Sequence, residues 1–316
     1  MASTIRVFTL IFSLFCFLGA AFKSSSQNQP IKLSEEAQIS VITFGPYQGE
    51  LWSAFGHNGI RVFDPLLDMD WMYDWGRFDF EQTNFFWNFA RGKMLYSIGR
   101  TQKYPDVKSY YIKQNRSLKE QVLNLSQAEN QAFFNSLEHN NLPENRTYLY
   151  NYVYDNCATK IRDIIQEMVP TATLDLSFKV PKKSVRDLMD DYLSDQPWGD
   201  FIIDVALAHP IDNEASANTY LFLPDYVHLA LEGGTIENIV DTLPLIKDSI
   251  AINVMKNEKR TQSTFDPFNT FVLLFFIVGF ITNQNFKNKK RTHWIDVLLF
   301  SIVGLFGWWF VFLWGA

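Results

Sequence analysis

Two long apolar segments near the C-terminal end restrict most strongly how this chain folds. Residues 268–286 contain FVLLFFIVGFI and residues 294–314 contain WIDVLLFSIVGLFGWWFVFLW. Each segment approaches the roughly 20 residues that a helix needs to cross a bilayer. Residues 287–293, KNKKRTH, lie between them and form a short basic loop, which the positive-inside rule places in the cytoplasm. We therefore expect transmembrane helices at 268–286 and 294–314.

The N-terminal end indicates the same topology. Residues 1–21 carry one basic residue, Arg6, then an apolar run that ends in small residues, which is typical of a secretory signal segment. The run is also near the lower length limit for a bilayer span, so an anchor helix is the alternative. Residues 30–262 are then expected to form a domain on the outer side of the membrane.

Charge and histidine spacing exclude several classes of function. The formal net charge is −6 and the sequence has no basic stripe with interleaved aromatics, so nucleic acid is not an expected partner. The histidines are scattered, and no Cys/His spacing suits a structural zinc. We expect neither a metal site nor a cofactor.

The outward domain shows both periods of regular structure. Residues 56–64 and 70–80, joined by the turn-like PLLDM, predict a β-hairpin. Helical spacing of apolar residues predicts a helix over 119–142. Together these patterns favour a mixed α+β fold. The remaining expectations are strands at 38–47, 148–154 and 219–223, helices at 184–193 and 226–231, and a polar stalk at 236–263.

Cys157 is the only cysteine after residue 21, and it lies where the period changes. Tyrosines alternate before it, and Ile161, Ile164 and Ile165 follow helical spacing after it. A thiol in the first turn of a helix is stabilised as a thiolate by unpaired backbone N–H groups and by the helix dipole. The same N–H groups can hold an oxyanion. The alternative is a small buried residue, but a single thiol in an oxidising compartment has no partner for a structural disulfide.

A nucleophilic thiol requires a base, and His57 has the most suitable context among the histidines. Gly56 and Gly59 flank it and leave room for a substrate, and IRV follows as a strand. A structural role for a lone histidine in such a strand is the alternative. If the hairpin turns at residues 66–67, residue 57 lies opposite residue 76, with Asp74 as its diagonal neighbour and Asp70 farther away. Both aspartates are therefore candidates to orient the imidazole.

Other polar residues near these motifs are candidates to bind substrate. Asn156 precedes the thiol, where either it or Asp155 can cap the helix, and Asn58 follows the histidine. We assign Asn156, Asn58 and Arg61 to substrate binding. Four basic side chains are candidates for a phosphate headgroup, with ordinary surface charge as the alternative: Arg61, Arg77, Arg91 and Lys93.

The order of these motifs resembles a known family. A histidine on an early strand and a cysteine that opens a helix after an asparagine are similar to the circularly permuted branch of the NlpC/P60 papain-like thiol enzymes, which includes lecithin:retinol acyltransferase. The stretches FGHNGIRVFDP, YDWGRFDF and YNYVYDNCATKIRD, followed by C-terminal membrane helices, resemble the periplasmic domain of Bacteroidetes proteins named for Lnb, a lipoprotein N-acyltransferase. The family has a Tyr-Asn-Tyr-Gly stretch where this chain has YDWG with Asp74.

This resemblance implies a permuted papain-like domain and an acyl transfer reaction. Cys157 would take an acyl chain from a phospholipid as a thioester, with His57 as base and then acid. The acceptor would be the α-amino group of the lipidated N-terminal cysteine of a diacylated lipoprotein. The resemblance places the protein in the bacterial inner membrane with its catalytic domain in the periplasm. Two alternatives stay open: a Cys-His hydrolase acting on phospholipids or cell-wall peptides, and a non-catalytic, membrane-tethered binding module.

Overall fold

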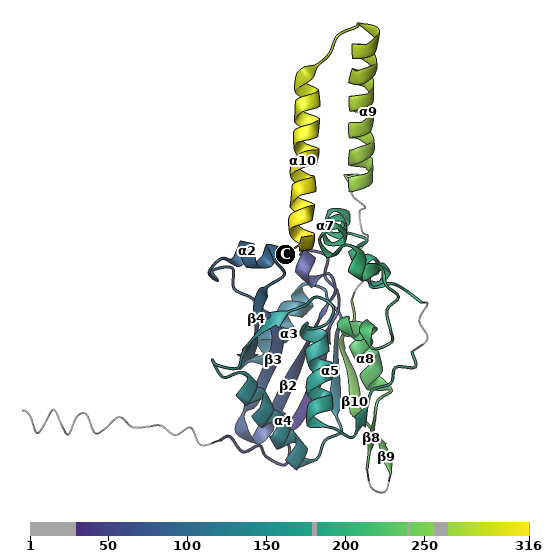
Figure 1. Ribbon diagram of the computed structural model, residues 1–316. Helices are drawn as coiled ribbons and strands as arrows, with labels where there is room; N and C mark the ends of the chain where they lie inside the picture. The colour runs from purple at the N-terminus through teal and green to yellow at the C-terminus, as the bar shows by residue number, and fades with distance from the viewer. Residues whose placement is uncertain (1–29, 179–181, 239–240, 256–264, 316) are drawn as a thin grey trace, which may run out of the picture. The chain divides into compact units, whose positions relative to one another are not determined.

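The computed structural model describes residues 30–178, 182–238, 241–255 and 265–315 (Figure 1). Its main feature is a seven-stranded sheet in the order β10-β5-β1-β2-β3-β4-β6, in which every neighbouring pair is antiparallel. The strands of this sheet are β1 (Gln38–Phe44), β2 (His57–Asp64), β3 (Met69–Arg77), β4 (Met94–Thr101), β5 (Leu118–Leu123), β6 (Thr147–Tyr150) and β10 (Ile246–Asn253). A small second sheet contains β7 (Ala172–Thr173), β8 (Thr235–Glu237) and β9 (Thr242–Pro244).

Helices cover both faces of the large sheet, so the expected mixed class of fold is confirmed. The helices are α2 (Phe85–Ala90), α3 (Tyr104–Lys113), α4 (Gln127–Asn140), α5 (Cys157–Met168), α6 (Val185–Leu193), α7 (Pro197–Leu207), α8 (Pro224–Glu232), α9 (Pro267–Lys287) and α10 (His293–Gly315). Short 3-10 helices lie at Leu51–Ser53, Pro65–Leu67, His209–Asp212 and Thr219–Phe222.

The main core lies between the sheet and helices α4, α5 and α8. Alternate residues of β2, such as Ile60 and Val62, pack there against Ile161 and Ile165 of α5, and all four side chains are fully buried. Burial of each such side chain contributes about 1.5–3 kcal/mol. A smaller core on the other face joins Tyr104 of α3 to side chains of β1, β3 and β5. The period-two pattern of the strands thus fixes α5 against the centre of the sheet.

The β2–β3 hairpin has the predicted register. Gly59 pairs with Asp74, which sets residue 57 across from Gly76. The turn is local in origin, because the Asp64 side chain accepts hydrogen bonds from the N–H groups of Leu66 and Leu67. His57 and Asp74 therefore project from the same face, two residues apart along the paired strands.

Four predicted elements differ from the structure. Residues 118–123 form strand β5, and α4 begins only after the cap Ser126, so the helix predicted over 119–142 is wrong in its first third. The tyrosine strand ends at Tyr150, because the side chain of Asn151 accepts hydrogen bonds from the N–H groups of Val153 and Tyr154 and turns the chain. Residues 219–222 form a 3-10 helix, and the predicted stalk contains β8, β9 and β10.

Helices α9 and α10 coincide with the two apolar segments of the sequence. Both are long and apolar enough to cross a membrane. Their large side chains are exposed, with Phe275 at 71% and Trp308 at 81%. The predicted signal segment, residues 1–21, lies outside the described residues.

Candidate active site

Cys157 is the first residue of α5, and the residue before it caps the helix. The Asn156 side-chain oxygen accepts hydrogen bonds from the N–H groups of Ala158 and Thr159, at 2.9 and 3.0 Å. The Thr159 hydroxyl in turn accepts a hydrogen bond from the backbone N–H of Asn156 at 2.7 Å, which completes a capping box. Of the first-turn donors in this described segment, the N–H of Cys157 is left free for an oxyanion.

His57 lies beside the thiol, and the two groups shift each other's ionisation. Burial favours the neutral form of both groups. The positive imidazole and its hydrogen bond nevertheless outweigh burial and lower the pKa of Cys157, with help from the backbone N–H of Asn58. The pKa of His57 is raised well above its ordinary value, because the thiolate and the hydrogen bonds to Asp74 and Cys157 together outweigh burial. These directions indicate a thiolate and imidazolium ion pair.

Asp74 orients the imidazole from the neighbouring strand. Its Oδ2 lies 3.2 Å from Nε2 of His57, which leaves the other ring nitrogen for the thiol. Burial opposes the charge on Asp74, but the hydrogen bond to His57 and the guanidinium of Arg77 lower its pKa overall. Arg77 donates from Nε to Oδ1 of Asp74 at 2.7 Å and from Nη2 to Thr101 at 2.9 Å. The carboxylate is therefore held ionised and fixed in place.

Aromatic rings surround the pair. His57 stacks on Phe44 with 6.0 Å between centroids, and Phe44 stacks on Tyr111 at 3.9 Å. Gly76, with φ at +96°, lies between the thiol and Tyr150, because a Cβ at this position would be 3.8 Å from both side chains. The positive φ explains the glycine here, since other residues rarely adopt it. Burial and the nearby thiolate raise the pKa of Tyr150 well above its ordinary value.

One buried cation near the site has no counterpart in the sequence predictions. Arg116 is 3% exposed, and its Nε donates to the carbonyl of Gly45 at 2.7 Å. Its guanidinium lies over the ring of Tyr111 at 4.5 Å. Nη2 makes no hydrogen bond to any described part of the chain, and burial lowers the pKa of the guanidinium, although nearby negative groups that include Cys157 oppose this. An isolated arginine before a strand gives no recognisable signal in the sequence.

The other predicted site residues are engaged elsewhere. Arg61 donates from Nε to Asp70 at 2.6 Å and from Nη1 to Glu120 at 2.9 Å, so both Arg61 and Asp70 belong to an internal ion network. Asp70 pairs with Phe63 in the hairpin, four residues from Asp74 along β3, and it accepts from Arg61 rather than from the imidazole. The assignments of Asp70 to the imidazole and of Arg61 to substrate are thus corrected.

The two asparagines are likewise used within the protein. Besides its capping bonds, Asn156 donates from Nδ2 to the carbonyls of Tyr152 and Phe222, at 2.9 and 2.8 Å. All four hydrogen bonds that an amide side chain can make are then satisfied internally. The Asn58 side chain is fully buried and donates to Thr43 at 2.9 Å. We therefore replace substrate binding by a structural role for Asn156 and by a backbone role at the thiol for Asn58.

The basic residues predicted to bind a phosphate headgroup lie in separate parts of the structure. Arg77 borders a polar cavity of about 580 Å³ that Arg100 and Arg146 also line. Arg91 lies after α2 with its guanidinium 6.0 Å from the ring of Trp87, and Lys93 is exposed close by. Arg77 thus connects the cavity to Asp74, whereas Arg91 and Lys93 are separate from it.

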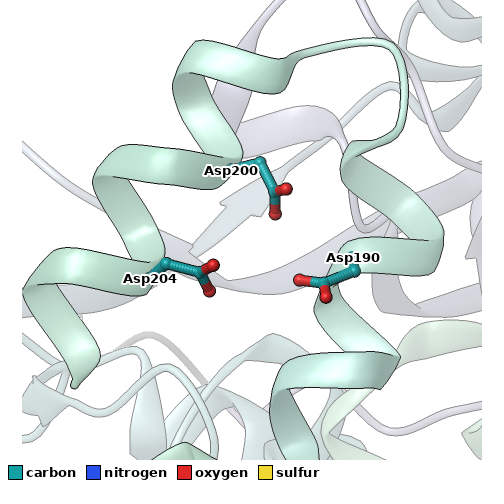
Figure 2. A group of neighbouring side chains, drawn as sticks. All are labelled: Asp190, Asp200 and Asp204. Atoms are coloured by element: carbon teal, nitrogen blue, oxygen red, sulfur yellow. The ribbon is translucent and has the colours of Figure 1, made fainter. Parts of the chain in front are cut away.

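A second group of titratable side chains lies on α6 and α7. Asp190, Asp200 and Asp204 point toward one another, with one oxygen of each within 4.8 Å of the others (Figure 2). Arg186 forms an ion pair with Asp204. Burial and the neighbouring carboxylates raise the pKa of Asp190 to about 7. Sequence spacing alone does not predict this group, because its members come from two separate helices.

Comparison with known proteins identifies the two parts of the chain. Residues 31–191 match the Lnb N-terminal periplasmic domain, and residues 258–316 match the Lnb transmembrane domain. No curated protein matches the chain. A crystal structure of a type VI secretion system effector, TseH, is 15% identical over 51% of this chain and 90% of that chain, with a TM-score of 0.30 that carries no weight for fold or function. With both domains matched in this order, the chain is a membrane-anchored protein with a periplasmic domain and belongs to the Lnb family, as its motifs predicted.

Proposed function

We propose that the protein is a cysteine acyltransferase of the bacterial inner membrane. It moves an acyl chain from a phospholipid through a thioester on Cys157 to the α-amino group of the lipidated N-terminal cysteine of a lipoprotein. The observation that carries the proposal is the ordered contact of Asp74, His57 and Cys157 in a chain of the Lnb family. A buried thiol with only a packing role has no need of an ionised partner.

The chemistry divides into two steps that share one base. The Cys157 thiolate attacks the ester carbonyl of the phospholipid, a C–S bond forms, and the ester C–O bond breaks. The leaving alkoxide takes its proton from the His57 imidazolium and departs as a lysophospholipid. The α-amine then attacks the thioester and gives a proton to neutral His57 as an amide forms. The C–S bond breaks and restores the thiolate and imidazolium.

The same residues support a permuted papain-like arrangement, which is part of the proposal. The thiol opens a helix that packs on an antiparallel sheet, and the histidine and its carboxylate lie on two neighbouring strands. In the chain, His57 precedes Cys157, which is the order that the permuted branch has. The free N–H of Cys157 and the N–H of Asn58 beside the sulfur are the candidate donors to the oxyanion.

Complementation in a bacterial host tests the proposal. The host lacks its own lipoprotein N-acyltransferase and expresses either the chain or its Cys157→Ser variant. Mass spectrometry of lipoprotein N-terminal peptides is expected to show triacyl forms with the chain and diacyl forms with the variant. Diacyl forms alone, despite good expression of the chain, would contradict acyl transfer. Release of fatty acid and lysophospholipid without amide would instead identify a hydrolase.

A further inference from the structure

A row of aromatic side chains connects the thiol to the membrane helices. Adjacent rings lie 4.2 Å apart for Tyr150 and Tyr96, 5.3 Å for Tyr96 and Phe78, 4.9 Å for Phe78 and Phe80, and 5.1 Å for Phe80 and Phe85. We call these residues, together with Trp87, the aromatic row: Tyr150, Tyr96, Phe78, Phe80, Phe85 and Trp87. They come from β6, β4, α2 and the segment that follows β3.

The inner end of the row lies at the candidate nucleophile. Tyr150 and Cys157 flank Gly76, whose missing side chain keeps the space between them open. Burial, together with the charge of the thiolate, raises the pKa of Tyr150. A ligand that lies along these rings therefore reaches Gly76, which neighbours Cys157.

The outer end lies against α10. Phe85 and Trp87 belong to the same helix, α2, and the ring of Trp87 is 5.2 Å from that of Phe312. Phe80 is 59% exposed and Trp87 is 54% exposed, which is unusual for side chains of this size in a protein that faces only water. Arg91 stacks on Trp87, and a cation beside exposed aromatics is typical of the headgroup region of a bilayer.

A second aromatic segment meets the other membrane helix. Trp198 and Phe201 of α7 contact Phe271 of α9, with ring centroids 6.4 and 5.6 Å apart. The indole N–H of Trp198 donates to the carbonyl of Phe265 at 3.2 Å, and Ile202 is 58% exposed. Each membrane helix thus contacts an apolar segment of the outward domain: α10 contacts α2, and α9 contacts α7.

We propose that α2 is seated in the headgroup region and that one acyl chain of a phospholipid lies along the aromatic row, with its ester at Cys157. This rests on the proposed function and adds the route that the donor takes. A single acyl chain fits these observations because ring contacts run without a break from Tyr150, close to Cys157, to Phe85 of α2, and Trp87 of the same helix contacts Phe312 of α10. Each methylene that lies on the rings is kept out of water, which favours long-chain donors.

The test compares two donors on the full chain. In the first assay the chain is reconstituted in vesicles of phosphatidylethanolamine and phosphatidylglycerol, which supply the acyl donor. In the second assay the chain is in detergent and 4-nitrophenyl butyrate is the donor. Acylation of Cys157 is followed by mass spectrometry in both. Phe80→Ser and Trp87→Ser change exposed side chains, so the fold is expected to persist. We expect each variant to lose about tenfold in the vesicle-supported rate and to stay within about twofold with butyrate. The matched control is Leu66→Ser, which changes a 66% exposed side chain at the far end of the hairpin.

The outcomes separate the route from the reaction. If both variants keep the wild-type rate with vesicles, the proposed route is wrong, but acyl transfer is not contradicted. The same conclusion follows if the variants lose activity equally with vesicles and with butyrate. A wild-type thiol that alkylates with iodoacetamide but takes no acyl group from either donor overturns the proposed function itself. As a second measurement, a phospholipid with a diazirine on one acyl chain is expected to cross-link the Cys157→Ser variant within residues 78–96. Cross-links confined to α9 and α10 would contradict the route.

Discussion

The thiol and the imidazole titrate as one pair, and this pair gives a test at the scale of the residue. The pKa of Cys157 is lowered and that of His57 is raised, because each group in its charged form stabilises the charge of the other against burial. Alkylation by iodoacetamide should therefore begin at lower pH than for an ordinary cysteine. His57→Gln removes the positive imidazole and its hydrogen bond, so burial, the largest influence, raises the pKa of the thiol although the backbone N–H of Asn58 remains. We expect the alkylation rate at pH 7 to fall at least about tenfold.

The control for this measurement is Tyr154→Phe, which changes an exposed side chain near the same helix. An identical dependence of alkylation on pH in the wild type and in His57→Gln would show that the imidazole does not ionise the thiol.

Asp74 is a positioning residue in the proposed mechanism. Replacement by Asn keeps the size of the side chain, but it removes the charge that helps to hold the imidazolium. We expect Asp74→Asn to lower acyl transfer by about 100-fold, because the imidazole loses the carboxylate that orients it. Asp70→Asn is the matched control, since Asp70 pairs with Arg61. Equal loss in the two variants would contradict the orienting role.

Asp190 makes stability depend on pH in a defined direction. Its pKa is raised to about 7, so the folded state binds more protons than the unfolded state between about pH 4 and pH 7. Stability from this group is therefore present at low pH and is lost as the pH rises through 7. Asp190→Asn should raise the melting temperature at pH 8 and change it less at pH 4. A larger gain at pH 4 would contradict this sign.

Local pattern was sufficient to predict one contact of the candidate site. The contact of His57 with Asp74 follows from the turn position and the period of two, both of which are local properties of the hairpin. The approach of Cys157 to His57 depends on how α5 packs on β2, a hundred residues away, so spacing could not predict it. Arg116 was missed for the same reason. Asn156 was misassigned because a helix cap and a substrate ligand look alike in sequence.

At the scale of the element, Asn156 is expected to contribute more to the free energy of unfolding than an ordinary helix cap does. Asn156→Ala removes two capping bonds, for about 1 kcal/mol. It also leaves the carbonyls of Tyr152 and Phe222 without this donor, at about 1–3 kcal/mol when such groups are buried. We expect a loss of roughly 2–4 kcal/mol in the free energy of unfolding, measured by denaturant titration.

Ser126→Ala provides the comparison for this variant. Ser126 caps α4 through a capping box with Glu129 and lies at an exposed site, so about 1 kcal/mol is expected. Equal losses in the two variants would mean that the bonds to Tyr152 and Phe222 contribute little.

The elements that sequence reasoning missed share a physical cause. LKEQVL, residues 118–123, has charged residues at positions that a helix pattern tolerates, yet it forms β5 between two other strands. Glu120 is buried there because Arg61 and Ser40 hydrogen-bond to it. Pairing between distant segments, rather than local preference, decides the structure of such a strand. The same holds for β10, which pairs with the distant strand β5.

At the scale of the whole molecule, the two C-terminal helices define a topology that labelling can test. The loop between them is predicted to be cytoplasmic. Asn288→Cys in a background of Cys16→Ser and Cys157→Ser should react with a membrane-impermeant maleimide only after the inner membrane is permeabilised. The control is Asn145→Cys, an exposed position of the outward domain, which should react once the outer membrane alone is opened. Labelling of residue 288 in intact spheroplasts would contradict the topology.

Strand β10 is the last strand of the sheet before the membrane helices, so a force on these helices acts first on this strand. It pairs with β5 over Ile246–Asn253, and α9 begins fourteen residues farther along the chain, at Pro267. Lateral drag on the helices is then transmitted along β10 and loads its hydrogen bonds with β5 in shear. A soluble fragment that ends at residue 191 loses this edge strand and exposes the backbone of β5 to aggregation. Strand β10 is therefore part of the fold, and a truncation that leaves the outward domain intact has to fall after residue 253.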